Sequence, residues 1–163
     1  MWHHLGRGAA LGLVAFALVT WPAQGQETPV VAEGHLAQPV GAWRVFVAPE
    51  LPGDPVFVNL SVFHSDGTLV GFPPASSLPD GTVVSGSTGI WRRTGIRDFD
   101  VVFFSTMYNG DLLAGYQRVR ARIQLTDEGR GFLGRFTNDI LDPDDNIVVS
   151  ITGTVTGKRI RID

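Results

Sequence analysis

Short runs of alternating apolar and polar residues, separated by turn residues, make up the chain from Gly41 onward. The runs are rich in Val, Ile, Phe and Thr, residues that favour β-strands. The predicted strands are Ala42–Ala48, Val56–His64, Thr68–Phe72, Ser87–Arg93, Asp98–Tyr108, Leu112–Thr126, Gly131–Leu141 and Ile147–Ile160. Because no stretch of this region keeps a helical period for long, the pattern predicts an all-β domain over residues 41–163.

Most connections between the predicted strands are short. Short turns cannot hold the crossover that parallel strands need, so strands adjacent in the chain are expected to pair antiparallel. Asn109-Gly110 is typical of a tight hairpin in which both central residues tolerate positive φ. A meander has two free edges, which invite aggregation unless the sheet closes. We therefore predict an eight-stranded antiparallel up-and-down β-barrel, with an open sheet or a sandwich as the alternative.

Glycine occurs inside several of the predicted strands, at Gly71, Gly89, Gly115, Gly134 and Gly153. Strand interiors normally avoid glycine, whereas barrels use it where a strand bends. These glycines favour closure, although bulges in an open sheet would also explain them.

One face of the predicted strands is apolar and the other is polar. In Leu112–Thr126, Val119 and Ile123 alternate with arginines. The apolar faces are expected to point inward, with the residues Trp43, Val45, Val47, Val119, Ala121, Ile123, Leu125, Ile147, Val149 and Ile151. A barrel of this kind holds either packed side chains or one small ligand. Asp98–Tyr108 is apolar on both faces, which favours a covering element or a homo-oligomer contact.

Residues 1–25 have the organisation of a signal peptide. The apolar run Ala9–Val19 is about 11 residues long, which is too short to span a bilayer. Ala23-Gln24-Gly25 offers small residues for a peptidase, so cleavage is expected before Gln26, and residues 26–40 are expected to form a flexible lead-in. The protein is therefore predicted to be secreted or periplasmic, in a bacterium. A buried N-terminal helix or an uncleaved anchor is the alternative.

The composition removes several classes of function. The chain has no cysteine, so disulfides, thiolate metal sites and cysteine nucleophiles are excluded. The formal net charge of −3 disfavours a nucleic-acid partner. After removal of the leader only His35 and His64 remain as histidines, and their spacing does not favour a zinc site. No metal, no cofactor and no stable membrane span are expected.

Two short segments hold residue types that occur in catalytic or metal sites. His64-Ser65-Asp66 has the residue types of a hydrolase triad, but consecutive residues at a hairpin point in different directions, so a turn is favoured. Asp142–Asn146 clusters the oxygen ligands that calcium prefers, but Pro143 interrupts it and the glycine and distal glutamate of a calcium loop are missing. A surface turn is favoured here too.

Arg118, Arg120 and Arg122 form a basic stripe on one strand face. Arg135, on the next predicted strand, is a candidate neighbour of this stripe. A solvated outer face that pairs with Asp139 and other acids is favoured over a site for an anionic head group.

The start of the first strand, Gly41-Ala42-Trp43, resembles the Gly-x-Trp motif of the lipocalin-like barrels of the calycin group. The closing segment Gly153–Ile160 is similar to the last strand of that family. The resemblance implies that a late arginine packs over Trp43 at the closed end of the barrel; Arg159 is the candidate and Arg161 the second choice. It also implies small apolar ligands.

The chain has no match to the Thr-Asp-Tyr motif of true lipocalins. Allene oxide cyclase-like barrels, which share the eight-stranded form and include ring-forming enzymes, are therefore a neighbouring possibility. Fold alone does not decide between these functions.

Three functions remain open for such a barrel. The first is binding of a small hydrophobic molecule in the lumen, for which the candidate residues are Trp43, Val45, Asn59, Trp91, Phe103, Tyr108, Tyr116, Ile123 and Asn138. The amides and tyrosines among them are the polar groups expected to orient a ligand. The second is a cyclase or isomerase that acts by conformational control, without identified catalytic residues. The third is a structural protein whose lumen is filled by tryptophans and phenylalanines.

Overall fold

The computed structural model describes residues 37–51, 53, 55–74 and 81–162 of the 163-residue chain. The predicted signal peptide and most of the predicted lead-in lie outside the described residues. The strands are β1 (Gly41–Pro49), β2 (Phe57–Phe63), β3 (Thr68–Phe72), β4 (Val83–Val84), β5 (Ser87–Arg93), β6 (Asp98–Asn109), β7 (Leu112–Thr126), β8 (Gly131–Leu141) and β9 (Ile147–Arg159). The short 3-10 turn η1 (Asp127–Gly129) joins β7 to β8.

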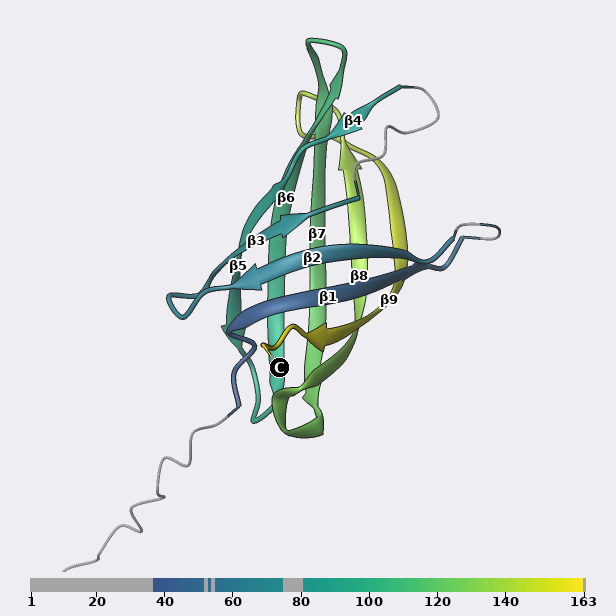
Figure 1. Cartoon of the computed structure of the whole chain (residues 1–163). Helices are drawn as coiled ribbons and strands as arrows, with labels where there is room; N and C mark the ends of the chain where they lie inside the picture. Colours follow the sequence, from purple (N-terminus) through teal and green to yellow (C-terminus); the bar gives the residue numbers. More distant parts are fainter. Residues whose placement is uncertain (1–36, 52, 54, 75–80, 163) are drawn as a thin grey trace, which may run out of the picture. The chain divides into compact units, whose positions relative to one another are not determined.

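The sheet closes on itself, as the sequence predicts (Figure 1). Around the ring the strands follow the order β6, β5, β3, β2, β1, β9, β8 and β7, and the additional pairing of β6 with β7 completes the circle. Every pairing is antiparallel, including that of the first and last strands, β1 and β9. Closure leaves the eight strands of the ring without a free edge.

The predicted loop Pro73–Gly86 contains the short strand β4, which the sequence pattern does not reveal. Val83 and Val84 pair with the far end of β6. After them, Ser85 continues along β6: its backbone N–H donates to Thr106 O at 2.9 Å, and its Oγ accepts from the Thr106 backbone N–H at 3.0 Å. β4 and β5 therefore lie in line along β6, separated by Ser85 and Gly86.

The hairpin between β6 and β7 differs from the predicted one by one residue. Asn109 is the last residue of β6 and pairs with Leu112, so the loop is Gly110-Asp111. Gly110 has φ of 59°, whereas Asn109 and Asp111 are not among the described residues with positive φ. A single positive φ at the first loop position matches a type II′ turn rather than a turn with two such residues.

The inward faces follow the predicted alternation except near the start of β9. Ile147 and Val149 were expected inside but are 54% and 46% exposed. β9 begins at Ile147, directly after the turn that leaves β8, and the pairing with β8 shifts its register beside Ile140. Solvent therefore reaches these two side chains, whereas Ile151 on the same strand lines the interior.

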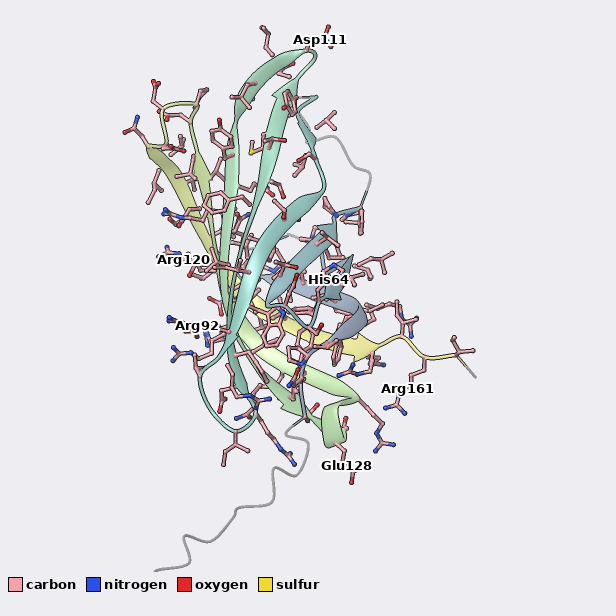
Figure 2. The ribbon with its side chains drawn as sticks, turned by 90° about the vertical axis from the view of Figure 1, so that its left-hand side faces the viewer. His64, Arg92, Asp111, Arg120, Glu128 and Arg161 are labelled. Atoms are coloured by element: carbon pink, nitrogen blue, oxygen red, sulfur yellow. The ribbon has the colours of Figure 1, made fainter. Side chains whose placement is uncertain are left out.

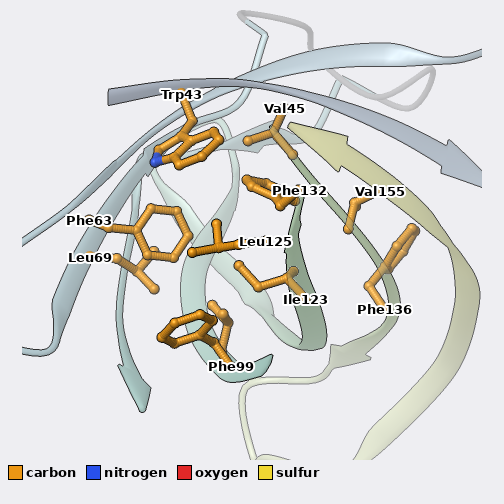
Figure 3. Close-up of a cluster of buried hydrophobic side chains, with 11 residues drawn as sticks. Trp43, Val45, Phe63, Leu69, Phe99, Ile123, Leu125, Phe132, Phe136 and Val155 are labelled. Carbon is orange, nitrogen blue, oxygen red and sulfur yellow. The ribbon is translucent and has the colours of Figure 1, made fainter. Parts of the chain in front are cut away.

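A dense apolar cluster fills one end of the barrel (Figure 3). Trp43 and Phe99 are fully buried, and Leu69 and Leu125 are nearly so. The Trp43 ring packs against Phe132 with 4.9 Å between centroids. Burial of large side chains of this type stabilises the fold by about 1.5–3 kcal/mol each. This end is therefore closed by packed side chains.

Arg159 covers the closed end of the barrel from outside. Its guanidinium carbon lies 4.4 Å from the centroid of the Trp43 ring, a cation–π distance. Its nitrogens donate to the carbonyls of Gly129 at 2.7 Å, Gln38 at 2.8 Å and Val40. The last strand is thereby tied to the segment before β1 and to the turn between β7 and β8.

The residues just before β1 are held against this end by the same kind of bond. The Trp43 indole N–H donates to Pro39 O at 2.6 Å, and Arg93 donates to Ala37 O at 2.8 Å. Gly41 has φ of 124°, and a Cβ there would lie 2.9 Å from an Arg159 nitrogen. Only glycine therefore fits both the backbone and the space at this position.

Candidate functional site

A cavity of about 400 Å³ lies inside the barrel, above the closed end. Its volume is within the range of small-molecule sites. β1 and β9 contribute only apolar side chains to its wall: Val45, Val47, Pro49, Ile151 and Val155. Phe132 and Phe136 of β8 continue this apolar side.

Glycines on β9 make room for the two phenylalanine rings. Gly157 is the direct cross-strand partner of Phe132, and Gly153 is that of Phe136. A Cβ on Gly153 would lie 2.5 Å from the Phe136 ring, and one on Gly157 would overlap the Phe132 ring. Each ring thus occupies the space over a position without a side chain.

The opposite part of the wall carries a band of polar side chains, here called the polar arc: Asn59, Ser61, Ser87, Ser105, Gln117 and Asn138. Strand register places several of its members next to one another. Ser61 pairs with Gly71, Gly71 pairs with Ser87, and Ser105 pairs with Gln117. Gly71 has no side chain, so the Ser61 and Ser87 hydroxyls face one another across it; a Cβ there would be 3.1 Å from Ser87 Oγ.

Asn59 and Asn138 stand out within the polar arc because their Oδ1 atoms are buried and accept no hydrogen bond. Asn59 is only 8% exposed. Its cross-strand partner is Val45, and Asn138 lies between Val119 and Ile151, so neither has a polar partner beside it. An unsatisfied buried acceptor costs about 1–3 kcal/mol. Each oxygen is therefore a buried acceptor without a partner, in a side chain that lines the cavity.

The described lining of the cavity holds no Asp, Glu, His, Lys, Arg or Tyr. A buried anion or cation would lose its hydration there without gaining a counter-charge. Nor does this lining supply an ionisable side chain for general acid or base chemistry. Among the described residues there is also no cluster of three or more His, Asp or Glu side chains that could hold a metal ion. The arrangement suits neutral molecules.

The structure brings five of the predicted lumen residues together around the cavity: Val45, Asn59, Phe103, Ile123 and Asn138. Trp43 lies in the packed closed end rather than in the lining. The other three are outside the lining. Trp91 packs edge-on against Phe99 and donates from its indole N–H to His64 O at 3.0 Å.

The two tyrosines lie outside the lining because of strand alternation. On β7, Gln117 and Val119 face the cavity, so Tyr116 is on the other face of the strand. Tyr108 follows a register shift after Met107 and is exposed.

The serines and Gln117 of the polar arc were not among the sequence candidates. They share the parity of apolar lining residues: Ser105 is two positions after Phe103, and Gln117 is two positions before Val119. That alternation is the signal that places them inside.

The arginine stripe lies on the outer face of the barrel, as the sequence predicts; Figure 2 shows Arg92 and Arg120 pointing away from it. Arg118 and Arg120 both contact Asp139 Oδ2, at 2.9 and 2.7 Å. Ser150 Oγ donates to Asp139 Oδ1 at 2.6 Å. The Ser150 hydrogen bond and then these arginines hold the pKa of Asp139 below its ordinary value.

The two segments that resembled catalytic or calcium sites are turns, as expected. Asp66 accepts hydrogen bonds from the Thr68 backbone N–H and hydroxyl, at 2.9 and 2.7 Å. Asp142 accepts from the backbone N–H groups of Asp144 and Asn146, both at 2.9 Å. These carboxylates close their own loops.

The outer face of β5 and β6 is partly apolar. Ile90 is 64% exposed, and Phe104 is also exposed. Ile90 pairs with Val102, which lies on the same outer face. A contact with a second copy of the chain through this face stays a prediction.

Comparison of the chain with protein-family models, with curated proteins and with solved structures finds no match in any of the three. The closed barrel is consistent with a lipocalin-like fold, and the resemblance to that family rests on the motifs and the geometry alone. No helix in the part of the chain that the structure describes has the length and apolar character needed to cross a bilayer.

Proposed function

We propose that this protein is an exported barrel that binds a small, mainly apolar molecule in its lumen. The observation that carries the proposal is the cavity of about 400 Å³ with its mostly apolar wall. Burial of apolar surface provides the binding energy: about 200 Å² of ligand surface removed from water contributes about 5 kcal/mol before the cost of association.

Two alternatives are less well supported. A structural protein with a filled lumen does not account for the cavity, because Trp43 lies at its closed end and Trp91 outside its lining. A cyclase or isomerase on this barrel would depend on shaping its substrate, since the described lining offers no acid or base. Ligand binding requires only an apolar cavity with a few polar groups, and the barrel has one.

Export is part of the proposal and rests on the sequence of residues 1–25. N-terminal sequencing of the protein from the medium or periplasm of its host tests it. The expected first residue is Gln26; a protein that keeps residues 1–25 and stays in the cytoplasm contradicts export.

The binding function is tested by native mass spectrometry of protein purified from its own host. The expected spectrum contains a complex with a bound small molecule. In a second sample Val119→Trp fills the cavity and abolishes the complex, while Val102→Trp on the outer face is the matched control and retains it. A wild-type protein that neither carries nor takes up any apolar compound overturns the proposal.

A further inference from the structure

The wall of the cavity is divided into two unlike sides. β1 and β9 present only apolar side chains, whereas β2, β5, β6, β7 and β8 each contribute a member of the polar arc. A ligand that is apolar on all sides would bury these polar groups against hydrocarbon. Each polar group left without a hydrogen-bond partner would then cost binding free energy. The wall thus matches a molecule that is itself two-sided.

From this division we infer that the ligand is a neutral molecule with hydroxyl or N–H donors along one edge and an apolar opposite edge. The inference rests on the proposed binding function and names its ligand class. Asn59 and Asn138 are the residues assigned to accept the donors.

The two asparagines are the reason that we assign hydrogen-bond donors, rather than acceptors, to the polar edge of the ligand. Asn59 is more than nine-tenths buried, lines the cavity, and has an Oδ1 without a hydrogen-bond partner. Asn138, on β8, is partly buried, and its Oδ1 is also buried without a hydrogen-bond partner. The unpartnered atoms are the oxygens, which only accept, so a ligand O–H or N–H satisfies them; a ligand ether or ketone bonds only the amide N–H groups and leaves the oxygens unpartnered.

We infer a neutral ligand because the described lining has no ionisable side chain. A carboxylate beside Asn59 Oδ1 would place two acceptors together in a site without a cation. Serine hydroxyls of the arc both donate and accept, so they tolerate either kind of neutral polar group. The ligand class is therefore a neutral alcohol, phenol or amide on an apolar frame.

Three biphenyls with one meta substituent on each ring, so that both polar groups lie along one edge in the syn conformer, test the inference: dihydroxybiphenyl, dimethoxybiphenyl and biphenyl dicarboxylate. Titration calorimetry with the full barrel at neutral pH measures each affinity. We expect dihydroxybiphenyl to bind at least tenfold more tightly than dimethoxybiphenyl, which accepts but does not donate. We expect no binding of the dicarboxylate.

Single variants then assign the effect to the two oxygens. Asn59→Leu and Asn138→Leu should each weaken dihydroxybiphenyl about tenfold and leave dimethoxybiphenyl unchanged. Neither should lower the melting temperature, because an unpaired buried oxygen is removed. Gln124→Leu removes an amide from the outer face, where Gln124 bonds Asp98, and should alter neither affinity.

The outcomes separate this inference from the proposed function. Equal affinity of the dihydroxy and dimethoxy compounds, or asparagine variants that change both alike, overturns the inference and leaves the binding function standing. Failure of every compound to bind, together with the absence of a bound molecule in host-purified protein, overturns both.

Discussion

At the scale of single residues, Asp139 is a buried carboxylate that the barrel wall fully engages. It is 1% exposed and accepts hydrogen bonds from Arg118, Arg120 and Ser150. The arginines remain partly in water, so they bring charge to the carboxylate without themselves being buried. Asp139 therefore joins β7, β8 and β9 through side chains as well as through the backbone.

Asp139→Asn should lower the free energy of unfolding by about 2 kcal/mol, because it removes the charge from several hydrogen bonds at once. Urea denaturation measures the change. Asp100→Asn is the matched control: Asp100 pairs with Arg92 and Arg122, both largely exposed, and its loss should cost less than about 1 kcal/mol. Equal losses in the two variants would contradict the role given to Asp139.

The lowered pKa of Asp139 also predicts how stability depends on pH. Its hydrogen bond from Ser150 and its contacts with the two arginines favour the charged form, so the folded-state pKa lies below 3.8. The stabilisation is therefore present above about pH 4 and is lost as the pH falls through the folded-state value. Urea midpoints measured from pH 6 to pH 2 should fall more steeply in the wild type than in Asp139→Asn. Parallel curves would count against this account.

At the scale of elements, the pairing of β8 with β9 sets the shape of the cavity. Phe136 lies over Gly153, and Phe132 over Gly157. Because glycine has no side chain, β9 leaves room for the phenylalanine rings of β8 in the wall of the cavity.

Gly153→Ala should destabilise the barrel by about 1–3 kcal/mol, because the new Cβ would overlap the Ala48 backbone oxygen and lie 2.5 Å from the Phe136 ring, so that both must move. Thermal denaturation measures the loss. Gly86→Ala is the control, since its nearest contact would be an ordinary 3.5 Å. A Gly153→Ala protein as stable as the control would show that neither the ring nor the neighbouring backbone needs that space.

The sequence predicted these elements well where turn residues bracket an alternating run. Thr68–Phe72, Ser87–Arg93 and Leu112–Thr126 were predicted with the bounds that the structure has. β4 was missed because two residues cannot show an alternation, and its pairing depends on a distant strand.

The candidate site was less predictable for a related reason. Asn59 and Asn138 were expected to reach inward, and both line the cavity. The serines of the polar arc were not, because a serine within a strand is equally typical of a solvated face. Sequence alone also does not show that the two asparagine oxygens lack partners, since that depends on which residues register places beside them.

At the scale of the whole molecule, Arg159 joins the two ends of the barrel domain. It links β9 to Gln38 and Val40 before β1 and to Gly129 in η1, while covering Trp43. The same side chain therefore covers the closed end and ties the last strand to the residues before β1.

Arg159→Met should destabilise the protein by about 3 kcal/mol or more, because it leaves several carbonyls without donors and uncovers the Trp43 ring. Chemical denaturation followed by tryptophan fluorescence measures the loss. Arg161→Met is the control, since Arg161 is exposed, and it should have no measurable effect. A larger loss for Arg161→Met would transfer the closing role to that residue.

Proton–nitrogen NMR of the side-chain amides, recorded while dihydroxybiphenyl is added, tests the central claim most directly. The account predicts that the amide signals of Asn59 and Asn138 shift together and saturate, while that of Gln124 on the outer face stays in place. Shifts confined to outer-face residues, or none at concentrations that saturate a typical small-molecule site, would contradict a two-sided binding cavity inside the barrel.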